Sequence, residues 1–190
     1  MHGPIFAGTA RAACELALDY ARERRQGRVP IAAHQSVVCR LSRMYRKVEA
    51  ARALARRAML YNFTQPVPAL EAAMASKITG TQAPFEVASD ALQIFGGAGI
   101  RRDRPIEKIF RDARLSMIED GCNEILAIKG GRHLADGRTT RGQGTADRGT
   151  ARQSVREYEG RNYPERTGWL RARPGISVCM RTIAGEGRRR

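Results

Sequence analysis

Three carboxylates surround a single glycine within a strongly basic chain. They are Glu119, Asp120 and Glu124, and the segment from Met117 to Ile125 reads MIEDGCNEI. Carboxylates can act as general bases, and a neighbouring glycine lets a substrate approach the backbone closely. Acids are also common where a helix begins, since that position stabilises them by about 0.3 to 1 kcal/mol and Asp120 could cap the helix. Composition alone therefore leaves a catalytic site and a decorated helix start both open.

A glycine-rich turn precedes this acidic cluster. Residues 93 to 113 read QIFGGAGIRRDRPIEKIFRDA, with Gly96, Gly97 and Gly99 between two helical patterns. The bare backbone N–H groups of such a turn can approach a phosphate or a ribityl chain. Paired glycines also end helices, and the local pattern alone favours that simpler interpretation.

The elements that must position both stretches are helices, because apolar residues recur at three- and four-residue intervals. The expected helices run to about residue 26, from about 37 to the prolines at 66 and 68, and over about 69–94, 105–117 and 122–134. One face of the third includes Lys77 and Thr81, and Pro84 lies inside it, where we expect a kink or a break. Long amphipathic helices with short turns predict an all-α, up-and-down four-helix bundle.

Composition divides the chain after Asp136. Residues 1–136 carry a net charge of +7, whereas residues 137–190 contain 13 Arg and no Lys and carry +8 of the total of +15. This second segment is rich in Gly, Arg and Thr without a sustained period, which predicts a disordered tail. Basic tails are usually only solvated, so we place nucleic-acid binding well behind that interpretation.

Other features narrow the class of protein. The four cysteines form neither C-x-x-C pairs nor ligand spacings with the three histidines, which predicts reduced thiols and no metal site. No apolar run approaches the roughly 18 residues of a membrane span, and the first residues do not resemble a signal peptide. We therefore expect a cytoplasmic protein.

The order and spacing of both stretches resemble the end of an acyl-CoA dehydrogenase. SDALQIFGGAGIRRDRPIEKIFRDARLSMIEDGCNEILAIKGGRHL follows the family series A-L-Q-x-x-G-G-x-G, then P-[VI]-E-[KR]-x-x-R-D-A, then E-G-T-x-[EQ]-I. Upstream, GTARAACELALDYARERRQGRVPIAAHQSV resembles the first helix of the family's C-terminal domain, so the resemblance covers roughly residues 3–134. It implies the four-helix bundle that holds FAD and builds the tetramer in that family.

The resemblance also implies cofactor-binding positions. They are Gln93, Gly96 and Gly97 in a loop that approaches a flavin nucleotide bound mainly to a neighbouring subunit, Arg24 and Gln26 in a turn beside the pyrophosphate, and Cys122 and Glu124 after the catalytic glycine. Guanidinium is a natural phosphate partner, which agrees with the position of Arg24. The chain departs from the family at Gly27 and Arg28, where Phe-Gly is usual. His34 and Gln35 are interpreted as interface or packing residues.

Asp120 matches the family's catalytic glutamate, the base that removes the substrate's α proton while a β hydride passes to flavin N5. Gly121 matches the glycine that lets the thioester come close. Aspartate is one methylene shorter than glutamate, which changes its reach by about 1.5 Å. We interpret this substitution as a sign of a non-standard acyl group.

The activity implied by the resemblance is FAD-dependent α,β-dehydrogenation of an acyl-CoA thioester. Expected partners are the acyl-CoA, further copies in a dimer or tetramer or full-length relatives, and an electron-accepting flavoprotein. Nothing here resembles the family's N-terminal and middle domains, which raises the hypothesis of a truncated, rearranged or frame-shifted reading frame and makes independent activity of this chain doubtful. The alternatives are a non-catalytic helical oligomerisation module and, less favoured, a basic nucleic-acid-binding protein.

Overall fold

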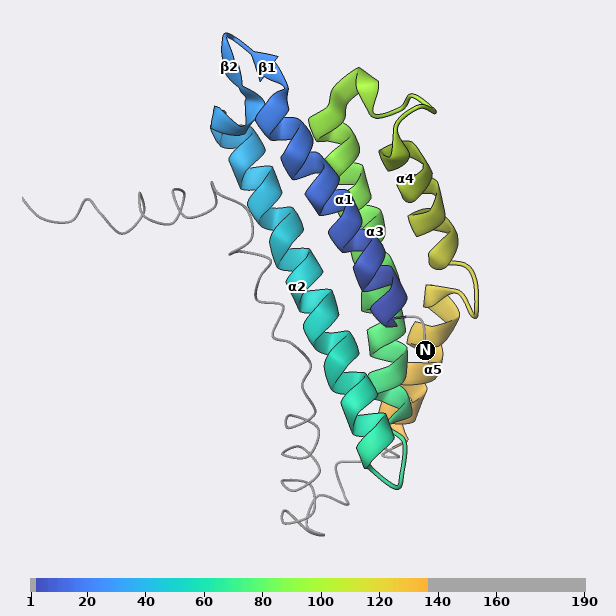
Figure 1. Ribbon diagram of the computed structural model, residues 1–190. Helices are drawn as coiled ribbons and strands as arrows, with labels where there is room; N and C mark the ends of the chain where they lie inside the picture. Colours follow the sequence, from blue (N-terminus) through green and yellow to red (C-terminus); the bar gives the residue numbers. More distant parts are fainter. Residues whose placement is uncertain (1–2, 137–190) are drawn as a thin grey trace, which may run out of the picture. The chain divides into compact units, whose positions relative to one another are not determined.

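Three long helices lie side by side and run alternately up and down in the computed structural model (Figure 1). They are α1 (Gly3–Glu23), α2 (Gln35–Thr64) and α3 (Leu70–Phe95). The structure describes residues 3–136. The expected disordered tail, residues 137–190, lies outside this described part, so the boundary after Asp136 stays a prediction.

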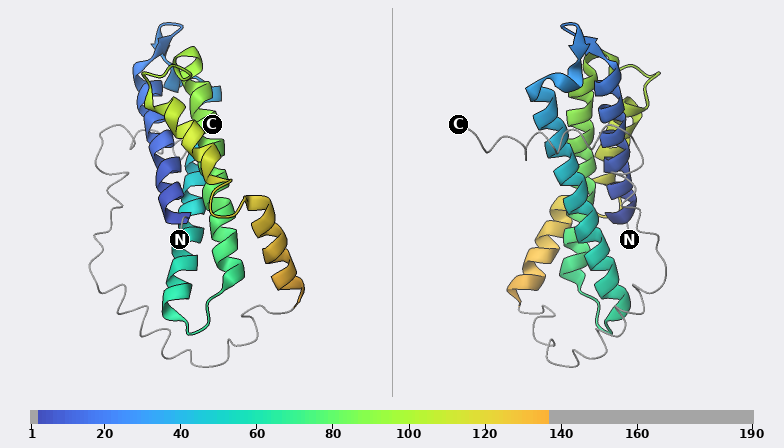
Figure 2. Two further views of the ribbon diagram at one scale, coloured as in Figure 1. Left: turned by 90° about the vertical axis from the view of Figure 1, so that its right-hand side faces the viewer. Right: turned by 60° about the vertical axis from the view of Figure 1, so that its left-hand side comes forward.

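Two shorter helices share the fourth position of the bundle. α4 (Pro105–Ser116) packs on the C-terminal half of α3, where Phe85 and Phe110 stack with ring centroids 5.2 Å apart. α5 (Asn123–Ala135) packs on the N-terminal half of α3, near Met74 (Figure 2). The predicted all-α bundle is confirmed, and its fourth helix is interrupted by residues 117–122, which contain Glu119 and Asp120 of the acidic cluster.

Short non-helical elements lie at one end of the bundle. α1 ends at Glu23 because the following residues pair as two antiparallel strands, β1 (Arg25–Gln26) and β2 (Val29–Pro30). Gly27 and Arg28 form the turn, with φ of 61° and 69°. The 3₁₀ helices η1 (Ile31–Ala33) and η2 (Gly96–Ala98) precede α2 and follow α3.

Of the kink or break expected at Pro84, the break is wrong, because α3 continues through this residue, and the kink stays a prediction. A proline removes one backbone hydrogen bond from a helix interior. Pro84 and its neighbours Ala83, Val87 and Ala88 are buried against the other helices. Tertiary packing of this segment therefore overrides its low helix propensity.

The core is built from small residues that let the helices approach closely. Ala10, Ala13 and Ala17 of α1 are fully buried against α2 and α3. Met44 and Val48 of α2 fill the space between them. Among the helices of residues 3–136, none has the length and the apolar character needed to cross a membrane.

Candidate active site

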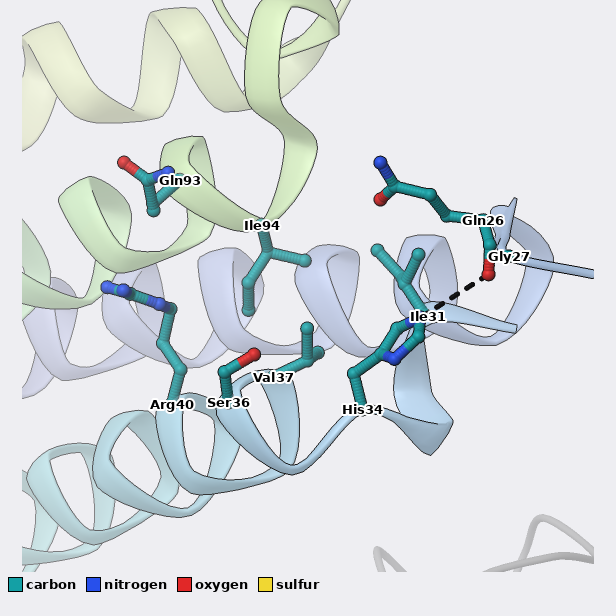
Figure 3. A pocket seen from close by; sticks show the side chains of 9 residues that line it. All are labelled: Gln26, Gly27, Ile31, His34, Ser36, Val37, Arg40, Gln93 and Ile94. Carbon is teal, nitrogen blue, oxygen red and sulfur yellow. Dashed lines mark hydrogen bonds between the residues drawn. The ribbon is translucent and has the colours of Figure 1, made fainter. Parts of the chain in front are cut away.

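A cavity of about 480 Å³ opens at the end of the bundle beside the short hairpin (Figure 3). Four elements line it: the hairpin with Gln26 and Gly27, η1 with Ile31, the first turns of α2 and its N-cap His34, and the last turn of α3 with Gln93. Two side chains assigned to the cofactor, Gln26 and Gln93, are thus brought to one cavity from positions 67 residues apart.

Hydrogen bonds hold the hairpin over this cavity. The Ile31 amide donates to the carbonyl of Arg24 at 2.8 Å. The His34 ring places Nε2 3.3 Å from the carbonyl oxygen of Gln26 (Figure 3). That contact is a hydrogen bond when Nε2 carries the proton, which leaves Nδ1 as an acceptor. His34 therefore lines the cavity, although its sequence context was interpreted as packing.

Arg40 lines the cavity and belongs to a group of charged side chains that joins α2 to α3. Arg40 Nη1 lies 2.5 Å from Asp90 Oδ1, and Lys47 Nζ lies 2.8 Å from Glu86 Oε2 and 3.7 Å from Asp90 Oδ2. The sequence did not predict Arg40 as a cavity residue, because α2 contains many basic residues. Only the packing of α2 against α3 shows which of them faces Gln93. Its guanidinium is held in place by Asp90.

The glycine-rich turn follows Gln93 directly. Gly96 ends α3 with a φ of 59°, a conformation that favours glycine. An added Cβ at Gly96 or Gly97 would meet no atom within 4 Å, so the space outside this turn is open. At Gly99 an added Cβ would lie 2.8 Å from the Cβ of Phe95. Gly99 is therefore a packing residue, whereas Gly97 leaves backbone accessible from outside.

Arg24 is not brought into the cavity. It lies between α1 and the hairpin with an exposed side chain, and it is absent from the residues that line the cavity. Its backbone carbonyl accepts the Ile31 hydrogen bond that fixes the hairpin. The structure therefore supports a role for the backbone of Arg24 and leaves its predicted phosphate contact untested.

The acidic cluster lies at the interruption between α4 and α5. Asp120 and Gly121 are exposed and both have positive φ, 53° and 92°. The N-cap of α5 is Cys122, which makes no side-chain capping hydrogen bond. Cys122 therefore occupies the N-cap position that local rules offered to Asp120. A non-glycine residue in the left-handed region costs of order 1 kcal/mol, so its surroundings must hold Asp120 in this conformation.

Lys77 is a second residue that sequence reasoning missed. It is only 8% exposed, and its Nζ lies 2.8 Å from the carbonyl oxygen of Gly121. Burial lowers the pKa of this lysine, while nearby groups led by Asp120 act in the opposite direction. A single lysine within the apolar face of α3 was the available signal, because lysine is almost never buried unless it is paired.

A family model, acyl-CoA dehydrogenase, C-terminal domain, matches residues 1–135 of the chain. The chain belongs to the acyl-CoA dehydrogenase family. An acyl-CoA dehydrogenase of Bacillus subtilis (strain 168) is 38% identical over 130 residues, which are 68% of this chain and 34% of the relative. The 3-sulfinopropanoyl-CoA desulfinase of Paraburkholderia xenovorans (strain LB400) is 40% identical over 122 residues, or 64% and 31%.

A solved structure shows the same arrangement of helices. Butyryl-CoA dehydrogenase from Megasphaera elsdenii matches with a TM-score of 0.65 and 30% identity, over 68% of this chain and 34% of that chain. The chain thus spans about a third of the length of the curated relatives it matches. Members of the acyl-CoA dehydrogenase family are FAD-dependent, bind acyl-CoA and form oligomers.

The residues around the cavity fit part of an FAD molecule. Two amide side chains, one imidazole and one guanidinium face it, and these groups suit the polar atoms of a nucleotide and its phosphates. The accessible backbone at Gly97 follows the cavity residue Gln93 by four positions in the sequence. None of Asp120, Gly121, Cys122 and Glu124 lines this cavity. In this acyl-CoA dehydrogenase domain, the predicted site residues therefore form two separate groups.

Proposed function

We propose that this chain supplies the catalytic base and one side of the FAD site of an acyl-CoA dehydrogenase. The observation that carries the proposal is the placement of Asp120. It is exposed in the interruption of the fourth helix, beside a glycine with a φ of 92°, and the motif order of the sequence aligns it with the family's catalytic glutamate. An unbroken helix at this position would have no such loop.

The residues of the chain divide the chemistry between them. Asp120 takes the α proton of the acyl-CoA on a carboxylate oxygen, and Gly121 leaves room for the thioester because it has no side chain. Gln26, His34 and Gln93 bind the cofactor at the cavity. FAD, when bound, accepts the β hydride. Cys122 and Glu124, which begin α5, are proposed as neighbours of the flavin.

The substrate class follows from the length of the base. Aspartate reaches about 1.5 Å less far than glutamate, and proton transfer depends steeply on position. We therefore propose an acyl group that brings its α carbon closer to the loop than a straight chain does, such as a cyclic acyl group. The proposed partners are this acyl-CoA, further copies of the chain and an electron-accepting flavoprotein.

The first experiment uses the 190-residue chain itself. Purified protein is mixed with FAD, freed of excess cofactor, and treated anaerobically with straight-chain and cyclic acyl-CoA thioesters while flavin absorbance is recorded. We expect bound flavin and bleaching that is fastest with the cyclic thioester. Asp120→Asn should keep the flavin and lose at least about 100-fold of the bleaching rate, the lower range for a general base. Equal bleaching by Asp120→Asn would refute the assignment of the base.

A second experiment joins this domain to the part of a longer relative that the chain does not match. Residues 3–136 replace the matching C-terminal segment of the Bacillus subtilis relative, and the chimera is assayed with and without Asp120→Asn. We expect a flavin-loaded chimera whose activity depends on Asp120. A folded chimera without flavin would show that this domain does not complete an FAD site.

The alternative of a non-catalytic oligomerisation module is favoured by one observation. Three isoleucines in the loop and on α5 are exposed: Ile118 by 57%, Ile125 by 48% and Ile128 by 50%. Self-association without flavin binding in both experiments would support this alternative.

The nucleic-acid alternative depends mainly on residues 137–190, which lie outside the described part. Salt-sensitive binding of nucleic acid that disappears when this segment is removed would support it.

A further inference from the structure

A buried ammonium group connects α3 to the loop that carries Asp120. Lys77 Nζ donates to the carbonyl oxygen of Gly121 at 2.8 Å and to Asn123 Oδ1 at 3.0 Å. The partners lie 44 and 46 residues further along the chain. One side chain thus binds both the residue after Asp120 and the first residue of α5.

A second donor, one turn further along α3, strengthens this connection. Thr81 is fully buried, and its Oγ1 lies 3.1 Å from Asn123 Oδ1 and 2.9 Å from the carbonyl oxygen of Lys77, so these two acceptors share its single proton. The Asn123 backbone amide donates to the carbonyl of Met117 at 3.1 Å, which closes the loop on itself. The loop of residues 117–123 is therefore fixed by its own backbone and by two side chains of α3.

The orientation of Asn123 shows which interaction dominates. Its Oδ1 faces both donors, while its buried Nδ2 has no hydrogen-bond partner among the described residues. Turning the amide over would place its N–H groups against the ammonium of Lys77. An unpartnered buried N–H group raises the free energy of the fold. This orientation is therefore favoured because it places an acceptor toward the ammonium of Lys77.

Burial of the charge itself is also unfavourable. Removal of water from Lys77 lowers its pKa, and the acidic groups of the loop and of α5 offset this only in part. A buried lysine needs its partners, and a well-packed apolar residue in its place is often as stable or more stable. The position is thus poorly explained by stability alone.

We propose that Lys77 is the positioning residue for the catalytic base, because it fixes the loop that holds Asp120 in its left-handed conformation. Its role in catalysis rests on the proposed function of Asp120, whereas its role in fixing the loop does not. Lys77 binds the carbonyl of Gly121 from inside the bundle, so it acts on Asp120 through the backbone. The ammonium touches neither the acyl-CoA nor the cofactor in this assignment.

The test compares Lys77→Met with Lys77→Arg and with Lys129→Met, which removes an exposed lysine of α5. Backbone amide exchange is measured along the 190-residue chain. We expect Lys77→Met to speed exchange in residues 117–123 by at least about tenfold, the effect of losing hydrogen bonds to a charged group. Exchange in α2 should stay unchanged, Lys77→Arg should restore part of the protection, and Lys129→Met should match the unmodified chain.

The catalytic readout is the rate of flavin bleaching at saturating acyl-CoA in the flavin-loaded chain. Lys77→Met should lower this rate at least about tenfold and leave the acyl-CoA concentration for half-maximal rate nearly unchanged, because positioning acts on the chemical step. A merely structural lysine would change the folded fraction and not the rate per bound flavin. Loop exchange that is the same in Lys77→Met and the unmodified chain overturns the proposal, whatever Asp120→Asn does.

A second variant covers the case in which Lys77→Met does not fold. Thr81→Val keeps the shape of the side chain and removes one donor to Asn123. It should raise exchange in residues 117–123 by about threefold, as the loss of a neutral hydrogen bond does. Unchanged exchange in this variant would overturn the network that the proposal requires.

Discussion

The catalytic assignment depends at the residue scale on backbone conformation as much as on side-chain type. Asp120 and Gly121 are consecutive residues with positive φ, so the carboxylate leaves the line of the helix and becomes exposed. Lys77 and Asn123 hold the end of this turn from inside the bundle. The backbone next to Asp120 is therefore held by a lysine 44 residues earlier in the chain.

Cys14 provides a test at the same scale. Its burial, together with the neighbouring Glu15 carboxylate, raises the pKa of the thiol from 9.0 to about 11. Between these values the unfolded chain has lost the thiol proton and the folded chain retains it. The free energy of unfolding should therefore be unaffected below pH 9 and should fall by about 1.4 kcal/mol per pH unit up to pH 11.

Urea unfolding followed by circular dichroism from pH 8 to pH 11 measures this dependence. Cys14→Ala is the reference, since it lies in an alanine-rich helix face and removes only this titration. Subtraction of the two curves cancels the contribution of Lys77, which has the opposite sign. Parallel curves for the two proteins across this range would contradict the prediction.

The central feature at the element scale is an ion-pair network between α2 and α3. Asp90 of α3 receives Arg40 and Lys47 from α2, and only 16% of its side chain is exposed. The same network holds Arg40 at the wall of the cavity. The contact that joins two helices thus also shapes the proposed cofactor site.

Asp90→Asn should destabilise the bundle by about 1 to 3 kcal/mol, because two partly buried cations lose a charged partner. Asp112→Asn is the matched control, since its partner Lys108 lies one turn away on the same helix and both are well exposed. This control should change the free energy of unfolding by less than about 0.5 kcal/mol. Thermal or urea unfolding of both variants decides the question, and equal losses would show that the network adds nothing.

At the scale of the whole molecule, the two groups of site residues lie apart. Gln26 and Gln93 line the cavity near the hairpin, whereas Asp120 lies at the interruption between α4 and α5. Asp120 and Gly121 are absent from the residues that line this cavity. The separation agrees with what the sequence resemblance implies, namely that the glycine-rich loop approaches a nucleotide of a neighbouring subunit.

The exposed apolar residues of α5 predict how copies associate. Replacing Ile125 and Ile128 together by lysine should shift the chain from dimer or tetramer toward monomer, because burying unpaired charges in an interface is costly. Ile100→Lys changes a more exposed isoleucine in the loop before α4 and should leave assembly unchanged. Light scattering after size-exclusion chromatography measures the mass. Retention of the oligomer by the double variant would place the interface elsewhere.

Much of this architecture was predictable from sequence, because it depends on local order. Apolar residues at three- and four-residue intervals set five helices close to their observed bounds. The spacing of the glycine-rich and acidic motifs predicted the family, which the family match confirms, and it aligned Asp120 with the family's catalytic residue. Both signals are contained within single segments, so no knowledge of packing was needed.

Only the tertiary structure decided the contacts between distant segments. It brought His34 and Arg40 to the same cavity as Gln93, kept α3 continuous through Pro84, and placed Lys77 against the loop of Asp120. Each outcome depends on which face of one helix meets another, and residues more than 40 positions apart carry no local signal of that meeting. Sequence alone therefore determined the helices and the family and pointed to Asp120 as the proposed base, and packing determined which residues hold the loop of Asp120.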